Sequence, residues 1–230
     1  MPEKIIGILG GMGPEATIDL FYKIIKFTPA EKDQEHLRII IDNNPKIPDR
    51  TAAILGKGES PLPALKETAQ NLEKAGADFI IIPCNTAHYF LPQIQESVNI
   101  PIINMIEETA SKVKRRGPHI KKVGLLASIG TYKTKIYHQY FHKFKIEVIS
   151  SEKEEQEEIM KIIYAVKAGD LSDEIKKDIL KIAQKLIDKG AEAIIAGCTE
   201  IPLILKEGDV SVPIIDPTQI LARIAVQKAR

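Results

Sequence analysis

The chain has 230 residues, of which 44% are hydrophobic and 27% are charged, and its formal net charge at pH 7 is +1. This length can bury the core of one or two domains, and the composition is that of an ordinary globular protein. The balanced charge gives no reason to expect a nucleic-acid partner. No apolar run approaches the ~20 residues that span a membrane, so we expect no membrane partner either.

The amino-terminus leads directly into an apolar segment, which leaves no room for a signal peptide. The only two cysteines, Cys84 and Cys198, are 114 residues apart and form no CxxC pair, which argues against a zinc site or a redox dithiol. The histidines also lack the spacing of metal ligands. We therefore expect a cytoplasmic protein with both thiols reduced and no bound metal.

Short apolar runs alternate with longer amphipathic stretches along the whole chain. The runs are continuous rather than alternating in polarity, which is typical of strands buried on both faces of a parallel sheet. The predicted strands are Ile5–Leu9, Ile39–Ile41, Phe79–Ile82, Ile102–Asn104, Val123–Ala127, Glu147–Ile149, Ala193–Ala196 and Ile214–Ile215. The predicted helices are Pro14–Lys26, Leu62–Ala75, Thr109–Arg116, Thr134–Phe144, Glu154–Ala168, Ile175–Lys189 and Thr218–Lys228. This alternation predicts an α/β fold with mainly parallel sheets flanked by helices.

The sequence also contains an internal duplication. Gly76 precedes Cys84 by eight residues and Gly190 precedes Cys198 by eight residues, with an apolar run between them in both copies. The segment Val-Gly-Leu-Leu-Ala-Ser-Ile-Gly-Thr in the second half likewise matches Ile-Gly-Ile-Leu-Gly-Gly-Met-Gly near the amino-terminus. The duplication predicts two pseudo-symmetric lobes that contribute one thiol each.

Prolines that open equivalent apolar runs suggest where the chain passes between the lobes. Pro101 begins such a run in the first copy and Pro213 begins one in the second. We therefore predict a first lobe formed by residues 1–99 and 213–230 and a second lobe formed by residues 100–212.

The residues with useful chemistry follow the predicted strands. In open α/β sheets, ligands bind at the carboxyl ends of the strands, so these segments are expected to converge on one cleft between the lobes. The segments are Gly10–Gly13, Asn43–Asn44, Cys84, Ser128–Thr131 and Cys198.

A single cysteine at a strand end is usually a small buried hydrophobic residue. Here both sulfurs have polar neighbours, in Cys-Asn-Thr and Cys-Thr-Glu, and a nearby helix amino-terminus would lower a thiol's pKa. Nucleophilic catalysis needs only one thiol and a base. Two thiols suit inversion of a carbon stereocentre, in which one removes a proton from one face and the other delivers a proton to the opposite face.

Three motifs in order along the chain resemble the cofactor-independent aspartate/glutamate racemase superfamily: Gly7-Ile-Leu-Gly-Gly-Met-Gly-Pro14, Pro83-Cys-Asn-Thr-Ala-His88 and Gly197-Cys-Thr-Glu-Ile201. Glutamate racemases typically carry Asp-Ser-Gly after the first strand and Cys-Thr-His at the second cysteine. This chain has Gly-Met-Gly and Cys-Thr-Glu there, which favours the aspartate branch or a broad-specificity racemase. The decarboxylases of the superfamily keep one cysteine, so the two thiols count against decarboxylation.

The resemblance implies an enzyme that interconverts L- and D-aspartate, with two lobes, a homodimer and neither pyridoxal phosphate nor metal. It implies that Cys84 and Cys198 are the catalytic thiols. By the same resemblance and the strand-end pattern, the substrate-binding residues are Met12, Asp49, Arg50, Thr51, Asn85, Thr86, Ala87, Ser128, Thr131, Lys167, Thr199 and Glu200. Arg50 would bind a carboxylate and Lys167 would reach over the cleft from a lid-like helix.

Each of these roles has a simpler alternative. Without the resemblance, Lys167 would be interpreted as a solvated helix lysine and Arg50 as a surface residue of a loop. His88 follows the first thiol and could act as a base, but its place beyond the loop favours an orienting or structural role.

Two other classes of function stay open from the residues alone. Gly11-x-Gly13-x-x-Ala16 after a strand, with Asp42 ending the next strand, imitates a dinucleotide-binding motif. This motif leaves the paired cysteines unexplained. The chain could also be a non-catalytic amino-acid-binding protein in which the thiols have no chemical role.

Overall fold

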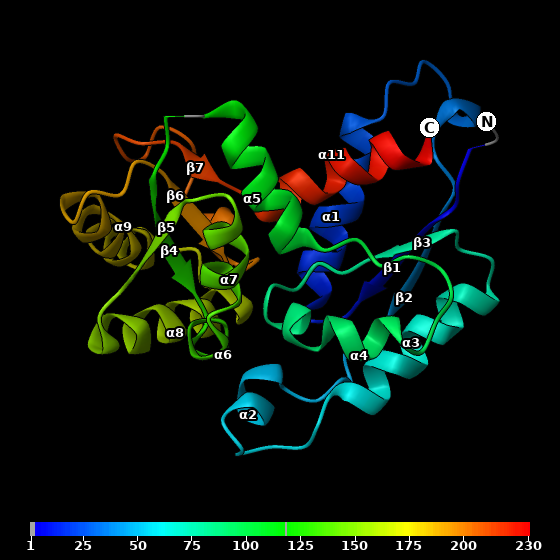
Figure 1. The fold of residues 1–230 in the computed structure, drawn as a ribbon, viewed down its shortest axis with the longest axis horizontal. Coiled ribbons are helices and arrows are strands. Elements are labelled where there is room, and N and C mark those ends of the chain that lie inside the picture. Colours follow the sequence, from blue (N-terminus) through cyan, green and yellow to red (C-terminus); the bar gives the residue numbers. More distant parts are fainter. Residues whose placement is uncertain (1–2, 118) are drawn as a thin grey trace. The chain divides into compact units, whose positions relative to one another are not determined.

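The computed structural model describes residues 3–117 and 119–230, and it divides into two compact units. The first unit is Met1–Glu108 with Thr218–Arg230, and the second is Thr109–Pro217. Each unit contains its own parallel sheet flanked by helices (Figure 1), which confirms the predicted α/β fold. Among the described residues, no helix combines the length and the apolar character needed to cross a membrane.

The first unit contains a three-stranded sheet in the order β2-β1-β3. Its strands are β1 (Ile6–Gly10), β2 (Ile39–Asn43) and β3 (Phe79–Ile81), and both neighbouring pairs are parallel. All five residues of β1 are buried, as expected for a central strand covered on both faces.

Helices cover both faces of this first sheet. Helices α1 (Pro14–Phe27) and α11 (Pro217–Ala229) lie against one face, and α3 (Leu62–Lys74) and α4 (Leu91–Gln95) lie against the other (Figure 1). Buried side chains of each pair of helices form a core with the sheet. Pro14 stands at the first position of α1, where its missing N–H costs no hydrogen bond. Three short elements complete the unit: η1 (Asp33–Glu35), α2 (Arg50–Ile54) and η2 (Thr86–Phe90).

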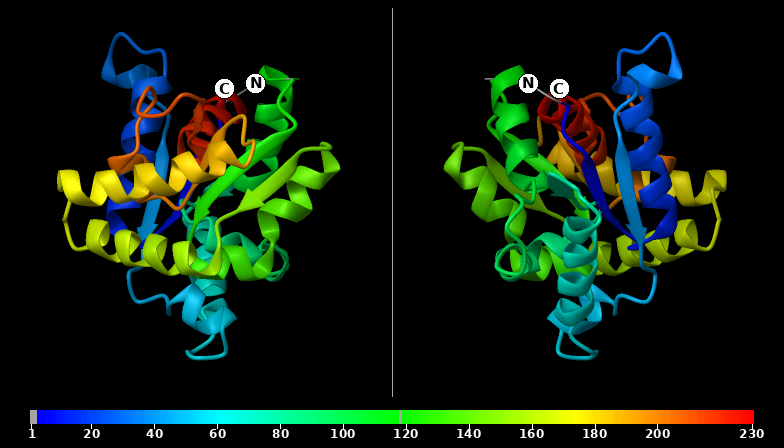
Figure 2. Two further views of the ribbon diagram at one scale, coloured as in Figure 1. Left: turned by 90° about the vertical axis from the view of Figure 1, so that its left-hand side faces the viewer. Right: turned by 90° about the vertical axis from the view of Figure 1, so that its right-hand side faces the viewer.

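The second unit contains a four-stranded parallel sheet in the order β5-β4-β6-β7. Its strands are β4 (Lys122–Ala127), β5 (Glu147–Ser150), β6 (Ile194–Gly197) and β7 (Ile214–Ile215). Its helices are α5 (Met105–Arg116), α6 (Ile129–Thr134), α7 (Ile136–Lys143), α8 (Lys153–Lys167), α9 (Asp173–Asp188) and α10 (Ile201–Ile204), with α5 beginning in the first unit. Figure 2 shows α8 and α9 running side by side.

The two sheets repeat one topology. In each, the first strand in sequence is central (β1, β4), the second is at an edge (β2, β5), and the third (β3, β6) pairs on the other side. A fourth segment then pairs with the third strand, through the isolated bridge between Ile80 and Ile102 in the first unit and through β7 in the second. The cysteines therefore follow equivalent strands, β3 and β6.

Three predicted elements differ from the structure, one of them only at its start, since the expected helix Thr109–Arg116 begins at Met105. The expected strand Ile102–Asn104 is reduced to the bridge at Ile102, because the Asn104 side chain already accepts hydrogen bonds from the first turn of α5, which begins at Met105. The expected helix Thr134–Phe144 corresponds to α7, which begins only at Ile136 because Lys135 takes the left-handed conformation, with φ of 52°; the preceding α6 was not predicted.

The passages between the units also lie later in the chain than the predicted positions at Pro101 and Pro213. The segment after Pro101 remains on the first sheet and β7 remains on the second, because each pairs with the strand that carries its unit's cysteine loop. The chain passes from the first unit to the second within α5 and returns to the first at the start of α11.

Candidate active site

The first thiol lies in a loop after β3. Cys84 is buried, its backbone N–H donates to the Ile82 carbonyl at 2.9 Å, and η2 follows directly. Asn85, Thr86 and Ala87 are buried beside it in sequence. This tight turn, at the carboxyl end of a buried parallel strand, holds the sulfur and its polar neighbours in one fixed arrangement.

His88 fixes this loop to the start of α5. Its Nδ1 lies 2.8 Å from the Cys84 carbonyl oxygen, and its Nε2 lies 3.1 Å from the Met105 backbone nitrogen. The Met105 N–H needs an acceptor, so Nε2 is unprotonated and Nδ1 carries the proton that it donates to Cys84. Burial lowers the pKa of His88 to about 4, with the backbone hydrogen bonds acting weakly in the opposite direction. His88 is thus a neutral structural link, and its two nitrogens are both occupied.

Met12 lies in the turn between β1 and α1. It is buried and belongs to the same apolar cluster as Cys84. The preceding Gly11 has φ of +95°, and a Cβ there would come within 2.3 Å of the Asn44 backbone. The close approach of the Gly11 and Asn44 backbones therefore explains why glycine is needed at position 11, without a bound dinucleotide.

Arg50 is the first residue of α2 rather than part of an irregular loop. Asp49 caps the helix by accepting from the Ala52 N–H at 2.7 Å, and Thr51 is half-buried. One terminal nitrogen of Arg50 donates to the Ile47 and Pro48 carbonyls at 3.1 and 2.9 Å. The Arg50 side chain is buried, and its Nε has no hydrogen-bond partner among the described residues.

The second thiol lies directly after β6, beside a buried carboxylate. The Cys198 sulfhydryl donates to Glu200 Oε2 at 2.8 Å, and the Thr199 hydroxyl donates to the same oxygen at 3.1 Å. Lys167 Nζ, at the end of α8, lies 3.9 Å from the other carboxylate oxygen. A buried carboxylate needs such donors and an opposite charge, and here they form a network around one thiol.

Ser128 and Thr131 lie at the carboxyl end of β4. Ser128 caps α6 by accepting from the Thr131 N–H at 3.3 Å, and their hydroxyl oxygens are 3.1 Å apart. Tyr132, which the sequence analysis did not single out, accepts from the Ala127 N–H and donates to the Leu125 carbonyl. Burial raises the pKa of Tyr132, so its hydroxyl stays protonated and supports the loop.

The predicted residues thus form two groups, one in each unit. The group at the carboxyl end of the first sheet is Met12, Asp49, Arg50, Thr51, Cys84, Asn85, Thr86 and Ala87. The group in the second unit is Ser128, Thr131, Lys167, Cys198, Thr199 and Glu200. The direct pairing of Lys167 with Glu200 had no signal in the sequence, because 33 positions separate the two residues.

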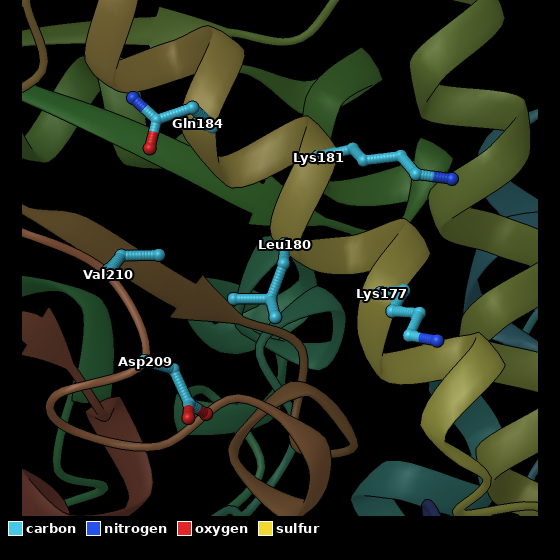
Figure 3. Close-up of a pocket in the computed structure, with 6 residues that line it drawn as sticks. All are labelled: Lys177, Leu180, Lys181, Gln184, Asp209 and Val210. Carbon is cyan, nitrogen blue, oxygen red and sulfur yellow. The ribbon is translucent and has the colours of Figure 1, made fainter.

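Two surface hollows contain none of these residues. One, of about 380 Å³, lies between α9 and the loop that carries Asp209 and Val210 (Figure 3). The other, of about 360 Å³, lies between α1 and the segment that leads into β2. Across residues 3–117 and 119–230, no three His, Cys, Asp or Glu side chains are grouped closely enough to hold a metal ion.

Comparison with known proteins decides the family. The family model for Asp/Glu/Hydantoin racemase matches residues 9–225, which is nearly the whole chain. The chain belongs to the Asp/Glu/Hydantoin racemase family. This membership and the relatives below support the activity of an amino-acid racemase that acts on a small amino-acid substrate.

Solved and curated relatives of the Asp/Glu/Hydantoin racemase family match over similar lengths. The aspartate racemase of Picrophilus torridus is 34% identical, with a TM-score of 0.87 over 98% of this chain and 94% of that one. An aspartate racemase homologue of Pyrococcus horikoshii OT3 is 31% identical, with a TM-score of 0.80 over 98% of this chain and 99% of that one. A broad-specificity amino-acid racemase of Bacillus subtilis (strain 168) is 29% identical over 96% of both chains.

Proposed function

We propose that this protein interconverts L- and D-aspartate without a cofactor, with one of Cys84 and Cys198 removing the α-proton and the other delivering a proton to the opposite face. The observation that carries the proposal is the equivalence of the two thiols: each follows the third strand of a repeated parallel sheet, at the edge where α/β proteins bind ligands. A duplicated fold that keeps one sulfur per copy supplies the matched acid and base that inversion of a stereocentre requires.

The proposed reaction conserves protons and electrons. The thiolate of one cysteine takes the α-proton, so that an S–H bond forms as the C–H bond breaks and the electron pair stays on the substrate. The thiol of the other cysteine then donates its proton to the opposite face and becomes the thiolate. The reverse reaction exchanges the two roles, so both enantiomers use the same pair of residues.

Glu200 is proposed to orient the Cys198 sulfhydryl and to exchange a proton with it. Its carboxylate accepts a hydrogen bond from the Cys198 sulfhydryl, with 2.8 Å between sulfur and oxygen, and is held by Thr199 and Lys167. This arrangement orients the sulfhydryl and can accept or return its proton as the cysteine changes role. The Lys167 ammonium lies beside this carboxylate. Its positive charge offsets the negative charge of Glu200 and, when Cys198 is a thiolate, that of the neighbouring sulfur.

Arg50 is proposed to bind the side-chain carboxylate of aspartate. Its buried Nε is a donor that finds no acceptor in the described part of the chain, and a guanidinium binds a carboxylate in two-point fashion. Asp49, Thr51, Met12 and the Asn85–Ala87 turn complete the first half of the proposed site. Ser128, Thr131 and Thr199 complete the second. By its resemblance to the family, the enzyme is also proposed to be a homodimer.

The first test replaces each thiol in turn. Cys84→Ala and Cys198→Ala should each abolish racemisation in both directions, and the double variant should be no worse, because either loss interrupts the same relay. In D2O, each single variant should still exchange the α-hydrogen of one enantiomer only, and the two variants should favour opposite enantiomers. Proton NMR of L- and D-aspartate measures both effects.

The controls for this test come from the chain itself. With only two cysteines present, each single variant retains one thiol, which alkylation and mass spectrometry can count. A single variant that racemises at the wild-type rate would refute the two-base mechanism. Binding of aspartate by the wild-type protein with no exchange of its α-hydrogen would favour a non-catalytic binding protein.

Broad specificity is the second candidate, favoured by the similarity to the Bacillus subtilis racemase. Substrate discrimination separates the two candidates. If Arg50 binds the side-chain carboxylate, Arg50→Ala should lower kcat/KM for aspartate by a factor that corresponds to about 2–5 kcal/mol of transition-state stabilisation, the cost of breaking a buried charge-assisted pair. The same change should barely alter kcat/KM for alanine. The exposed Arg115→Ala variant is the matched control. An equal loss on both substrates would instead assign Arg50 to the α-carboxylate or the scaffold, and would favour broad specificity.

A further inference from the structure

The free edge of the first sheet is unusually apolar. β2 is an edge strand that pairs only with β1, and its sequence is Ile-Ile-Ile-Asp-Asn. Exposed edges are normally blunted by lysine, proline or very short strands, because their unpaired N–H and C=O groups attract another strand. β2 carries neither residue type within its bounds, and Ile41 is 38% exposed.

The hydrogen bonds to β1 define which groups of β2 are unpaired. The Arg38 carbonyl accepts from the Ile6 N–H, and the Asn44 N–H donates to the Gly10 carbonyl. The backbone N–H and C=O groups of the even-numbered residues of β2 therefore point toward β1. The N–H and C=O groups of Ile39, Ile41 and Asn43 therefore point to the free edge, since successive residues of a strand alternate.

The same edge is complementary to itself in antiparallel orientation. The segment Arg38-Ile39-Ile40-Ile41-Asp42 places a cation and an anion symmetrically about Ile40. If Ile40 faces Ile40 of a second copy, Ile39 exchanges backbone hydrogen bonds with Ile41 of that copy, and Arg38 faces Asp42 of that copy. The exposed Arg38 and the half-buried Asp42 lie on one face of the strand, so this register gives two symmetric ion pairs.

An apolar surface continues from this edge onto α1. Ile18 and Tyr22 of α1 are 66% and 55% exposed. Phe21 and Ile25 of α1 line the hollow of about 360 Å³ together with Ile39 of β2, so the helix and the edge form one surface. Contiguous exposed apolar surface of this kind marks an interaction site.

The equivalent strand of the second unit provides an internal comparison. β5 also pairs with a single neighbour, but it begins with the charged Glu147, whose carboxylate lies 3.4 Å from Lys122. Its Ser150 hydroxyl is bonded to His138 at 3.1 Å. The sequence Glu-Val-Ile-Ser has no charge symmetry of the kind found around Ile40. The self-complementary edge is thus a feature of β2 and not a consequence of the repeated fold.

We propose that two copies of this chain associate through antiparallel pairing of their β2 strands, with Arg38 of each copy facing Asp42 of the other. The two three-stranded sheets become one sheet in the order β3-β1-β2-β2-β1-β3. The α1 surface of each copy then covers the seam beside Ile41. The inference rests on the proposed homodimer and names its surface, and its test measures association rather than activity.

Charge reversal tests the pairing. Analytical ultracentrifugation over a dilution series should show a dimer for the wild type. Arg38→Asp should weaken it roughly 10- to 100-fold, because two attractive pairs become repulsive. Arg38→Asp combined with Asp42→Arg should restore the wild-type dissociation constant. Ile41→Pro should give a monomer, since it removes an N–H at the free edge, whereas Ile41→Val should leave the dimer intact.

Thermal unfolding of each variant separates lost association from lost folding, because the ladder between β1 and β2 does not use the Ile41 N–H. A wild-type protein that is monomeric throughout the dilution series would overturn the proposal, and so would a monomer that binds a different protein through this surface. A dimer that is unchanged by Arg38→Asp and Ile41→Pro would place the interface elsewhere. Racemisation by a monomeric wild type would leave the two-thiol mechanism intact while refuting this interface.

Discussion

At the scale of single residues, the two thiols differ in their surroundings although their strands are equivalent. Cys84 is followed by the neutral Asn85 and Thr86, and its loop is held by the neutral His88. Cys198 donates to the carboxylate of Glu200, which also interacts with Lys167. The duplicated halves therefore keep the sulfur and the strand end but divide the charged groups unequally.

This asymmetry predicts the effect of Glu200→Gln. The amide keeps the size of the side chain and an oxygen acceptor but cannot take up a proton, so racemisation should fall by about 10²–10⁴-fold, the usual contribution of general acid–base groups. The pH profile of kcat should change while KM for aspartate changes little. Steady-state kinetics in both directions from pH 5 to 9 measures the separate effects on kcat and on KM.

A matched carboxylate serves as the control for Glu200. Glu155 is buried to a similar degree in the same unit, accepts at the α8 cap and pairs with Lys185 at 3.0 Å. Glu155→Gln should reduce stability and leave the pH profile unchanged. If Glu200→Gln shows only the same loss of stability, its carboxylate has a structural role alone.

At the scale of elements, His88 couples η2 to α5. It bonds the Cys84 carbonyl with one nitrogen and the Met105 N–H with the other, so the cysteine loop and the helix that leads into the second unit share one neutral side chain. Protonation of Nε2 would remove the acceptor for Met105 and place a charge in a fully buried position. The loop's stability is therefore linked to pH.

The lowered pKa of His88 gives the sign of this linkage. Below pH 6.5 the unfolded chain binds a proton at His88, whereas the folded chain does so only near pH 4. The contribution to stability is complete above pH 6.5 and is lost as pH falls toward 4, in total on the order of 3 kcal/mol. Urea unfolding of wild type and His88→Gln should give free energies of unfolding whose difference shrinks over this range. The exposed His142→Gln is the control, and a constant difference for His88→Gln would contradict the assignment.

At the scale of the whole molecule, duplication supplies two copies of one sheet topology. The units differ at their edges: β2 is apolar and self-complementary, whereas β5 begins with a charged residue paired to its neighbour. The chain leaves the first unit within α5 and re-enters it in α11, so the amino- and carboxyl-terminal segments pack together. The backbone bond from the Lys4 N–H to the Ala229 carbonyl, at 2.8 Å, is part of that packing.

The sequence alone determined the α/β class, the family and the two cysteines at strand ends, because continuous apolar runs and a local motif repeated 114 residues later are properties of neighbouring residues. It also marked most helices. The predicted strand Ile102–Asn104 is a single bridge at Ile102, because the Asn104 side chain caps α5 and the helix begins at Met105. This cap depends on side-chain geometry, which the local sequence pattern does not give.

Only the tertiary structure decided which distant groups meet. Lys167 reaches Glu200, His88 reaches Met105, and Arg50 turns toward the carbonyls of the loop that precedes α2. The free edge of β2 became visible only when strand order was known, since a run of three isoleucines reads the same in a central strand as at an edge. Local pattern predicts what an element is, whereas pairing across the fold decides what each side chain contacts.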